Sequence, residues 1–496
     1  MALADYYGRG ALAAAQVLEG FDEAAFRGRL EEFPVGVAFD DAAMTTEGKA
    51  LLDLLVRLLA RLYPRLTLRG PSNYVHVLAE LATSINPAIE IGDEPRIGVS
   101  VGSGKAPFET TSYAGASGWD ALLSTTRPQP IGDSANPLGA GVAACLAAAN
   151  VFRRAFVNDW RATVDTSVRF STLRFDRVDQ ATRGPRSRWQ LADDAVLVGV
   201  GAVGNAAVWA LGRAPLDGTV HLVDPEAIEL GNLQRYVLTK RSDEGATKVD
   251  VAASIQTRGL KLIPHHLTLA GFLSGHGYTW DAFLLGLDSA RDRRSAQAAL
   301  PRWIANAWTQ PGDLGVSVHP RFGDEGACVA CLYLPDGRVP NEDELVSRAL
   351  NVPQLQMQVR TLLYSGAPLQ RDFLETVARA VARPLDALLP FEGRSIRELY
   401  VEGFCGGAVI PLGEAGRPPQ ELHVPLAHQS ALAGVLLAAA LIRSALGADP
   451  PITSASRLDV LQPVGTALTQ PIRPRRDGGC LCDDPVFCER YRAKYP

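Results

Sequence analysis

The chain has 496 residues, of which 47% are hydrophobic, and its 49 basic and 54 acidic residues leave a net charge of −5. This length predicts two or three domains of a globular protein, and the absence of a basic run argues against nucleic acid as a partner. The N-terminus shows no secretory signal, and the longest apolar stretch, Ala431 to Ile442, is too short to cross a membrane. The 7 cysteines, an odd number, argue against a disulfide framework, so we expect a cytoplasmic protein.

Residues 1–160 form the first predicted unit. Helical patterns at Leu12–Phe21 and Ala43–Leu62 precede a strand-like run at Ile97–Val101, and an alanine-rich helical pattern, Gly139–Phe156, closes the unit. Within it, Val142–Phe156 aligns without gaps with Leu432–Leu446 of a second alanine-rich pattern near the C-terminus, Ser430–Leu446. The first unit has no complete glycine fingerprint, so the repeat suggests a duplication with one degenerate copy. The polar, arginine-rich residues 161–192 are predicted to connect the two units.

Residues 193–335 alternate between strand-like and helical patterns, which predicts βαβ units and a mostly parallel sheet. The expected strands are Ala195–Val198, Thr219–Val223, Ala282–Leu287 and Gly315–His319. We therefore expect an α/β, Rossmann-like domain here, which resumes at residues 401–496.

A glycine-rich turn follows the first of these strands, in the sequence AVLVGVGAVGN. Gly199, Gly201 and Gly204 have the spacing of a nucleotide-binding loop, in which glycine lets the backbone approach phosphate. The next apolar run ends at Asp224, where a carboxylate is placed to hold ribose hydroxyls. This pattern alone is compatible with either a dinucleotide or ATP.

The residues after Asp224 favour ATP. Asn232, Arg235 and Lys248 supply neutral and cationic donors that an NAD-dependent oxidoreductase does not need. An enzyme that breaks the α–β bond of ATP needs them to stabilise charge on the phosphates. Asp288 follows a predicted strand at the edge where open α/β sheets bind ligands, and its carboxylate is a candidate Mg²⁺ ligand.

Residues 336–400 interrupt the alternation with short amphipathic helical patterns, which predicts an inserted helical module. A glycine-marked segment, VEGFCGGAVIPLG, follows it and contains Cys405. Gly406 and Gly407 next to this cysteine would let the backbone approach a narrow ligand.

Two further cysteine pairs predict a structural zinc site. Cys328 and Cys331 form a Cys-x-x-Cys pair, while Cys480 and Cys482 form a Cys-x-Cys pair near the C-terminus. Four thiolates from two pairs make a closed tetrahedral site. Cys488 is an alternative fourth ligand, because the second pair is unusually short.

The glycine loop, Asp224, the sequence Asn-Leu-Gln-Arg at 232–235, Lys248, Asp288 and the cysteine pairs together resemble the ThiF/MoeB and ubiquitin-activating enzyme superfamily. The resemblance implies that the three loop glycines, Asp224, Asn232, Arg235 and Lys248 bind ATP, that Asp288 holds Mg²⁺ and that the cysteines hold Zn²⁺. It also implies an internal pseudo-dimer, in which residues 1–160 are an inactive adenylation-like domain and residues 193–335 and 401–496 are the active one. A homodimer is the alternative arrangement.

For the reaction, the resemblance implies that the C-terminus of a ubiquitin-like protein is adenylated. Cys405 would then form a thioester and pass the acyl group to a conjugating enzyme. The single-chain layout is similar to activating enzymes of bacterial antiphage operons of the BilD type. Two alternatives remain: a ThiF/MoeB-type adenylyltransferase for a sulfur carrier or peptide, and an NAD-dependent oxidoreductase.

Overall fold

The computed structural model of the chain describes residues 3–92, 94–105, 108–157, 160–185, 188–323, 326–334, 341–405, 424–450, 452–475 and 479–496. The chain divides into two compact units. The core unit comprises residues 1–7, 28–334 and 425–496, and the insert unit comprises residues 8–27 and 335–424.

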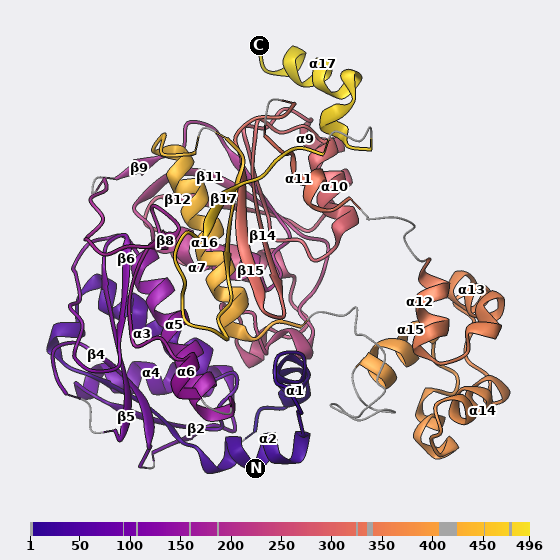
Figure 1. Cartoon of the computed structure of the whole chain (residues 1–496), viewed down its shortest axis with the longest axis horizontal. Helices are drawn as coiled ribbons and strands as arrows, with labels where there is room; N and C mark the ends of the chain where they lie inside the picture. Colours follow the sequence, from indigo (N-terminus) through magenta and orange to yellow (C-terminus); the bar gives the residue numbers. More distant parts are fainter. Residues whose placement is uncertain are drawn as a thin grey trace. The chain divides into compact units, whose positions relative to one another are not determined.

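The core unit contains two large sheets (Figure 1). The first sheet has the strand order β3-β2-β1-β4-β5-β6-β7-β8. Its strands are parallel from β3 to β5 and antiparallel from β5 onward. Their bounds are β1 Val35–Phe39, β2 Arg65–Arg69, β3 Glu90–Ile91, β4 Ile97–Val101, β5 Thr110–Ser117, β6 Asp120–Ser124, β7 Ser167–Ser171 and β8 Asp176–Arg177.

The second sheet has the strand order β12-β11-β10-β13-β14-β15-β16-β17, with β9 paired to β11. The strands are parallel from β12 to β14 and antiparallel from β14 onward. Their bounds are β9 Trp189–Gln190, β10 Ala195–Val198, β11 Leu216–Val223, β12 Leu260–His265, β13 Ala282–Leu285, β14 Trp303–Gln310, β15 Asp313–His319, β16 Ser454–Leu458 and β17 Thr469–Pro471.

Position by position, the two sheets share one strand order and one pattern of directions. The connecting helices correspond as well. Helix α3, Thr46–Leu59, follows β1 as α7, Ala202–Arg213, follows β10. Helix α5, Leu138–Phe156, lies between β6 and β7 in the chain as α16, Ala427–Ala445, lies between β15 and β16, where the insert unit precedes it. The two aligned alanine-rich patterns of the sequence therefore occupy equivalent places in the two sheets.

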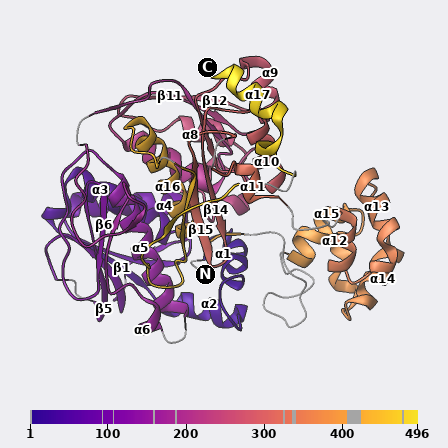
Figure 2. The same cartoon turned by 45° about the horizontal axis from the view of Figure 1, so that its top comes forward.

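Four helices fill the space between the sheets. Helix α5 packs on β5 and β6, α16 packs on β14 and β15, and the layer is completed by contacts of α3 with α5 and of α16 with α5 and α7. Figures 1 and 2 show α16 lying between the two sheets in both views. Residues 138–155 of α5 and 427–443 of α16 are all buried. Helices that are apolar on every side are expected at the centre of a large core.

Small residues set the spacing of this layer. A Cβ on Gly434 of α16 would lie 2.3 Å from the carbonyl oxygen of Val203 in α7. A Cβ on Gly141 of α5 would lie 2.9 Å from the ring of Trp209 and 3.1 Å from Val435. Because real Cβ atoms do not approach so closely, glycine at 434 lets α16 pack on α7 within the second half, and glycine at 141 lets α5 of the first half pack on both of them.

The remaining helices of the core unit cover the outer faces and edges of the sheets. They are α4 Ser72–Ile85, α6 Trp160–Thr163, α8 Lys248–Ala253, α9 Leu269–His276, α10 Ala290–Ala298, α11 Val329–Leu332 and α17 Pro485–Lys494. Two N-terminal helices, α1 Tyr7–Ala15 and α2 Glu23–Glu32, lie at the boundary of the unit definitions. Among the described residues, no helix is long and apolar enough to span a bilayer.

The insert unit has a helical core of its own. Its helices are α12 Glu342–Ala349, α13 Gln356–Ser365, α14 Arg371–Ala380 and α15 Ile396–Glu398, followed by a π-helical segment, Leu399–Cys405. Phe373, Leu374, Val377 and Leu399 are among the side chains that form its buried cluster. In α14 the apolar residues recur at helical spacing, as the sequence pattern predicted.

The predicted α/β class with a mostly parallel, Rossmann-like sheet is confirmed. The four strands predicted in residues 193–335 are present, although β11 and β15 begin earlier, at Leu216 and Asp313, and β13 ends earlier, at Leu285. The sequence analysis did not predict β14, Trp303–Gln310. Strands β7 and β8 lie within residues 161–192, predicted as a connector, and they complete the first sheet.

Candidate functional site

The glycine loop joins β10 to α7 at the carboxyl edge of the second sheet. Gly199 has a φ of +87°, a conformation that favours glycine. A Cβ on Gly204 would lie 2.2 Å from the carbonyl oxygen of Gly199, so this glycine lets the helix pack against the loop. Gly201 precedes α7, and a Cβ there would meet only the Tyr236 hydroxyl at 3.5 Å. Packing within the chain therefore explains Gly199 and Gly204 but not Gly201.

Asp224 follows β11 directly and lies beside this loop. Its carboxylate accepts hydrogen bonds from the backbone N–H of Val200 at 2.8 Å and of Glu226 at 2.9 Å. Asp224 is 6% exposed. Burial raises the pKa of its carboxyl group, while Lys248 and the two N–H groups oppose the rise. The Asp224 carboxylate therefore holds the backbone of the glycine loop in place, so the two parts of the candidate nucleotide site are in direct contact.

Lys248 begins helix α8 and is buried, with 5% of its surface exposed. Its ammonium group forms an ion pair with the carboxylate of Glu226 and lies 5.4 Å from the centre of the Tyr236 ring. Burial alone would lower the pKa of Lys248, but electrostatic interactions with Tyr236 and Asp224 and the hydrogen bond to Glu226 raise it. A charged lysine is therefore held next to the glycine loop.

Arg235 and Asn232 lie in the segment between β11 and α8. The guanidinium of Arg235 lies 5.7 Å from the centre of the same Tyr236 ring and donates a hydrogen bond to the carbonyl oxygen of Gly231 at 3.3 Å. The Asn232 side-chain oxygen accepts a hydrogen bond from the Glu229 N–H at 3.0 Å. Asn232 therefore caps a short turn in this structure.

Asp288 lies shortly after β13 and is exposed. The backbone of Gly286 packs against the glycine loop, since a Cβ on Gly286 would lie 2.9 Å from the carbonyl oxygen of Gly199. Arg293 fixes the following turn by donating hydrogen bonds to the carbonyl oxygens of Leu287 and Ala307. An exposed carboxylate on a fixed turn beside the glycine loop has the oxygen chemistry that Mg²⁺ requires.

Two residues of this site were missed by the sequence analysis. Tyr236 lies under both cations, and Glu226 is the ion-pair partner of Lys248. Tyr236 directly follows Arg235 in the chain, so its position was the available signal. Glu226 lies in a turn with no motif of its own.

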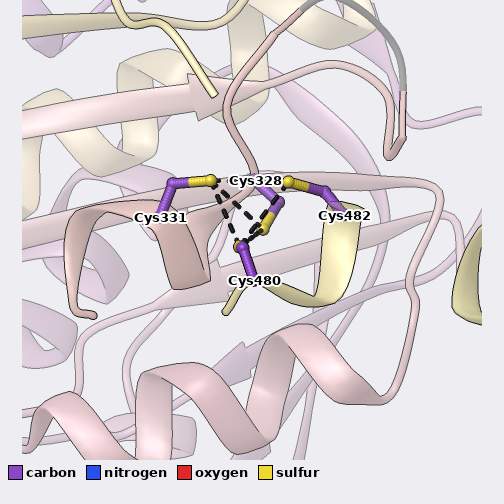
Figure 3. Close-up of side chains that lie close together, drawn as sticks. All are labelled: Cys328, Cys331, Cys480 and Cys482. Carbon is purple, nitrogen blue, oxygen red and sulfur yellow. Dashed lines mark hydrogen bonds between the residues drawn. The ribbon is translucent and has the colours of Figure 1, made fainter. Parts of the chain in front are cut away.

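The four predicted zinc ligands come together near the C-terminus (Figure 3). Cys328 and Cys331 flank the start of α11, and Cys480 and Cys482 come from the turn before α17. All four are buried, and their sulfur atoms lie within 4.8 Å of one another. The Cys331–Cys480 and Cys328–Cys480 sulfur distances are 3.2 Å and 3.4 Å.

This geometry fits a tetrahedral metal site. Zinc–sulfur bonds of about 2.3 Å place sulfur atoms roughly 3.8 Å apart, so a small expansion would admit the ion. A hydrogen bond from Cys328 lowers the pKa of the Cys331 thiol, and the backbone N–H of Arg475 donates to the same sulfur at 3.4 Å. Cys488 instead contacts the carbonyl oxygen of Cys482 at 3.4 Å and lies outside the group of four.

The predicted nucleophile, Cys405, is the last residue of the π-helical segment. Its side chain lies outside the described residues, as do residues 406–423 with their glycines. Its role stays a prediction.

In comparisons with known proteins, different family models match the two halves of the chain. Residues 38–157 match the model of prokaryotic E2 family C, and residues 185–258 match the model of the ThiF family. The uncharacterized protein y4jF of Sinorhizobium fredii (strain NBRC 101917 / NGR234) is 40% identical over 508 residues, which cover 100% of this chain and 98% of y4jF.

Solved structures of E. coli MccB are more distant. MccB alone and MccB with succinimide are each 14% identical to this chain, with TM-scores of 0.36 and 0.34. The matches cover 59% and 58% of this chain and 66% of each MccB chain, just under two thirds. A likeness at this level does not bear on activity or substrate. The full-length match to y4jF and the ThiF match are decisive: the chain belongs to the family of y4jF, within the ThiF/MoeB superfamily.

Proposed function

We propose that this protein activates the C-terminal carboxylate of a ubiquitin-like protein with ATP. One observation carries the proposal: a buried, charged lysine and a buried aspartate lie together beside the glycine loop at the carboxyl edge of the second sheet. Open parallel sheets bind ligands at this edge. An aspartate for ribose and a lysine for phosphates suit ATP better than NAD. Gly201 supports the proposal, because its missing side chain leaves room for a ligand rather than for the chain.

In the first step the carboxylate oxygen of the substrate attacks the α-phosphorus of ATP, and the bond to pyrophosphate breaks. Lys248 and Arg235 offset negative charge on the phosphates as it shifts to the leaving group. Asn232 would donate its Nδ2–H to a phosphate, while its Oδ1 keeps the hydrogen bond from the Glu229 N–H. Asp288 would hold Mg²⁺, which supplies further positive charge when bound.

In the second step the Cys405 thiolate attacks the carbonyl carbon of the acyl-adenylate. The carbon–sulfur bond forms as the carbon–oxygen bond to AMP breaks, so AMP leaves and a thioester remains. A separate conjugating enzyme then accepts the acyl group on its own cysteine. We place the protein with bacterial antiphage enzymes of the BilD type, on the basis of its single-chain layout with two similar halves.

The first half would be a degenerate adenylation-like unit, so that the chain is an internal pseudo-dimer. The shared strand order supports this. After β1, at the place of the glycine loop, stands Asp40, whose carboxylate accepts hydrogen bonds from the N–H groups of Ser103 at 2.9 Å and Gly104 at 2.7 Å. In the first half, the Asp40 carboxylate thus accepts backbone N–H groups at the end of the sheet where the second half would bind phosphate. Strand β2 ends at Arg69, and Gly70 follows it at the position that Asp224 has after β11.

The match to prokaryotic E2 family C raises a different role for the first half, which its cysteine content disfavours. Cys145 is the only cysteine in residues 38–157. It is 0% exposed in α5, and burial raises the pKa of its thiol far above the ordinary value. A conjugating cysteine must be accessible and ionisable. We therefore propose that the conjugating enzyme is a separate protein.

The four buried cysteines would hold a structural zinc ion that ties the C-terminal helix α17 to the end of the second sheet. All four positions are protein sulfur, which leaves no coordination site open for substrate. This ion therefore has no part in the two chemical steps.

The alternative is a ThiF/MoeB-type adenylyltransferase for a sulfur carrier or a peptide. It would use the same nucleotide site but would need no thioester at Cys405. The insert unit, with its own buried core leading into Cys405, favours the ubiquitin-like reaction over this alternative.

The test of adenylation is ATP–pyrophosphate exchange with a ubiquitin-like protein encoded by a neighbouring gene. Wild-type protein should exchange only when this partner is present, and Asp288→Ala should abolish exchange. Asp292→Ala is a matched control, since Asp292 is also acidic but lies in the first turn of α10, where its carboxylate accepts a hydrogen bond from the N-cap Ser289 at 2.9 Å. Exchange that persists in Asp288→Ala would contradict the magnesium assignment, and no exchange in the wild type would contradict adenylation of that partner.

The test of thioester formation is a DTT-sensitive adduct between the two proteins. Cys405→Ala should keep exchange but lose the adduct, while Cys488→Ala, a cysteine outside the group of four, should keep both. An adduct that survives in Cys405→Ala would place the nucleophile elsewhere. Exchange without any adduct in the wild type would favour the sulfur-carrier or peptide alternative.

A further inference from the structure

Arg61 of the first half binds the backbone of residues 236–239, which follow Arg235 in the candidate nucleotide site. It follows helix α3, and its Nη2 donates hydrogen bonds to the carbonyl oxygens of Tyr236 at 2.5 Å and Thr239 at 2.6 Å. These two residues lie more than 170 positions further along the chain. The same guanidinium donates to the carbonyl oxygen of Arg57 at 2.7 Å. One side chain thus ties the first half to the segment between Arg235 and Lys248.

Two more contacts fix the same segment. Arg57 in α3 donates to the carbonyl oxygen of Val237 at 2.9 Å. Asn205 in α7 accepts from the Leu238 N–H at 3.0 Å and donates to the carbonyl oxygen of Val200 in the glycine loop at 3.1 Å. The backbone of residues 236–239 is therefore bound at four consecutive residues, and it is connected directly to the glycine loop.

Tyr236 transmits this constraint to the cations of the site. Its carbonyl oxygen is held by Arg61, and its ring lies under the ammonium of Lys248 and the guanidinium of Arg235. Tyr236 is 4% exposed, so its ring has little freedom to move. If the backbone of Tyr236 shifted, its ring would move too, and Lys248 and Arg235 would lose the aromatic surface on which they lie.

Burial of the Arg61 side chain costs more free energy than burial of an apolar side chain would. It is 3% exposed, and burial lowers the pKa of its guanidinium to about 10. Within the described part of the chain it forms no ion pair with a carboxylate: its hydrogen bonds go to carbonyl oxygens, and Asp53 and Asp243 favour its charge without contacting it. Burying a charge without a counter-ion costs free energy. That cost indicates a role beyond filling space.

We propose that Arg61 is a positioning residue that, with Arg57, sets residues 236–239 so that Arg235 and Lys248 are presented to the phosphates of ATP. The degenerate first half then contributes to catalysis without touching the nucleotide. This inference rests on the proposed nucleotide function.

The experiment compares the affinities of the full chain for MgATP and for adenosine, each measured by titration calorimetry. Arg61→Lys keeps the positive charge but loses the planar fork that reaches two carbonyl oxygens. It should weaken MgATP binding by about tenfold, the equivalent of roughly one lost hydrogen bond to a charged group. Adenosine, which carries no phosphate, should bind as in the wild type. Arg57→Lys should shift the ratio in the same direction by a smaller factor.

Arg154→Lys provides the matched control. Arg154 is 4% exposed in α5 of the same half, and burial lowers its guanidinium pKa to about 10 as well, but it donates a hydrogen bond to the carbonyl oxygen of Thr111 at 3.2 Å. The ratio of the two affinities should stay at the wild-type value in this variant. An unchanged ratio in Arg61→Lys, or an equal change in Arg154→Lys, would overturn the positioning role. A wild-type protein that does not prefer MgATP to adenosine would instead overturn the nucleotide function itself.

Discussion

The indole Nε1 of Trp209 donates a hydrogen bond to the carboxylate of Asp53 at 2.8 Å, which joins a helix of the second sheet to a helix of the first. The same oxygen of Asp53 accepts from Arg213 at 2.9 Å and from Arg57 at 3.0 Å. Burial would raise the pKa of Asp53, but Arg57, Arg213 and Trp209 lower it overall. One carboxylate therefore serves two arginines and a tryptophan at the junction of the halves.

We expect Asp53→Asn to destabilise the protein by about 3 kcal/mol, because two partly buried arginines would lose their counter-ion. Urea unfolding followed by tryptophan fluorescence measures the change. Glu90→Gln, which removes an exposed partner of Arg65 in the first sheet, should cost less than about 1 kcal/mol. Equal effects of the two substitutions would contradict the importance of the junction.

Lys248→Ala should lower the rate of ATP–pyrophosphate exchange by roughly 100-fold or more, the usual effect of removing a preorganised donor from a charged transition state. Lys240→Ala removes an exposed lysine of the same segment and should leave the rate within about twofold, since exposed charges contribute little. A Lys248→Ala protein with a tenth or more of the wild-type rate would place the phosphate contact on another residue.

Metal analysis of the purified protein should find about one zinc ion per chain. Cys480→Ser should lose the metal and lower the thermal unfolding temperature, because the group of four would keep only three sulfur ligands. Cys488→Ser should keep the metal, since Cys488 contacts a backbone carbonyl instead. Zinc lost from Cys488→Ser but retained in Cys480→Ser would reverse the assignment of the fourth ligand.

Acid should destabilise the protein through His428, which begins α16 and is 5% exposed. Burial, with a smaller effect from Arg153, lowers its pKa to about 3. The unfolded chain binds this proton below pH of about 6.5, whereas the folded chain does not bind it until about pH 3. The free energy of unfolding should therefore fall by about 1.4 kcal/mol per pH unit from this group over that interval.

The His428→Gln variant tests this slope, because glutamine does not titrate. Its unfolding free energy, measured in urea between pH 7 and pH 5, should depend less steeply on pH than that of the wild type. His76→Gln, the same substitution at an exposed position of a helix, is the control. A steeper or identical slope in His428→Gln would mean that the histidine is charged in the folded protein.

Local patterns were enough to predict the parts of the site that lie within one turn or one pair. The glycine loop and Asp224 follow from a strand–turn–helix pattern, and the four cysteines follow from the spacing within each pair. The contribution of the first half could not be predicted in this way. Arg61 binds backbone carbonyl oxygens, which every residue possesses, so the sequence of residues 236–239 carries no sign of the contact.

The full set of strands in each sheet could not be predicted from the sequence either. Strands β7 and β8 are polar and short, and β7 is held by hydrogen bonds to β6, from which the whole of α5 separates it in the chain. Strand β14, WIANAWTQ, lacks a clean alternation because it is buried along most of its length between two neighbours. Pairing across a sheet, rather than the local residue pattern, defines these elements.

The layer of buried helices between the sheets has a practical consequence for anyone who works with separate pieces of this protein. A truncated protein with only the second half would expose a long face of α16 and the ring of Trp209 to water. A protein with only the first half would expose α5. That surface would be largely apolar, because α5 and α16 are rich in alanine and leucine and are buried on all sides over most of their length. The two halves should therefore be produced as one polypeptide and should unfold in one cooperative transition.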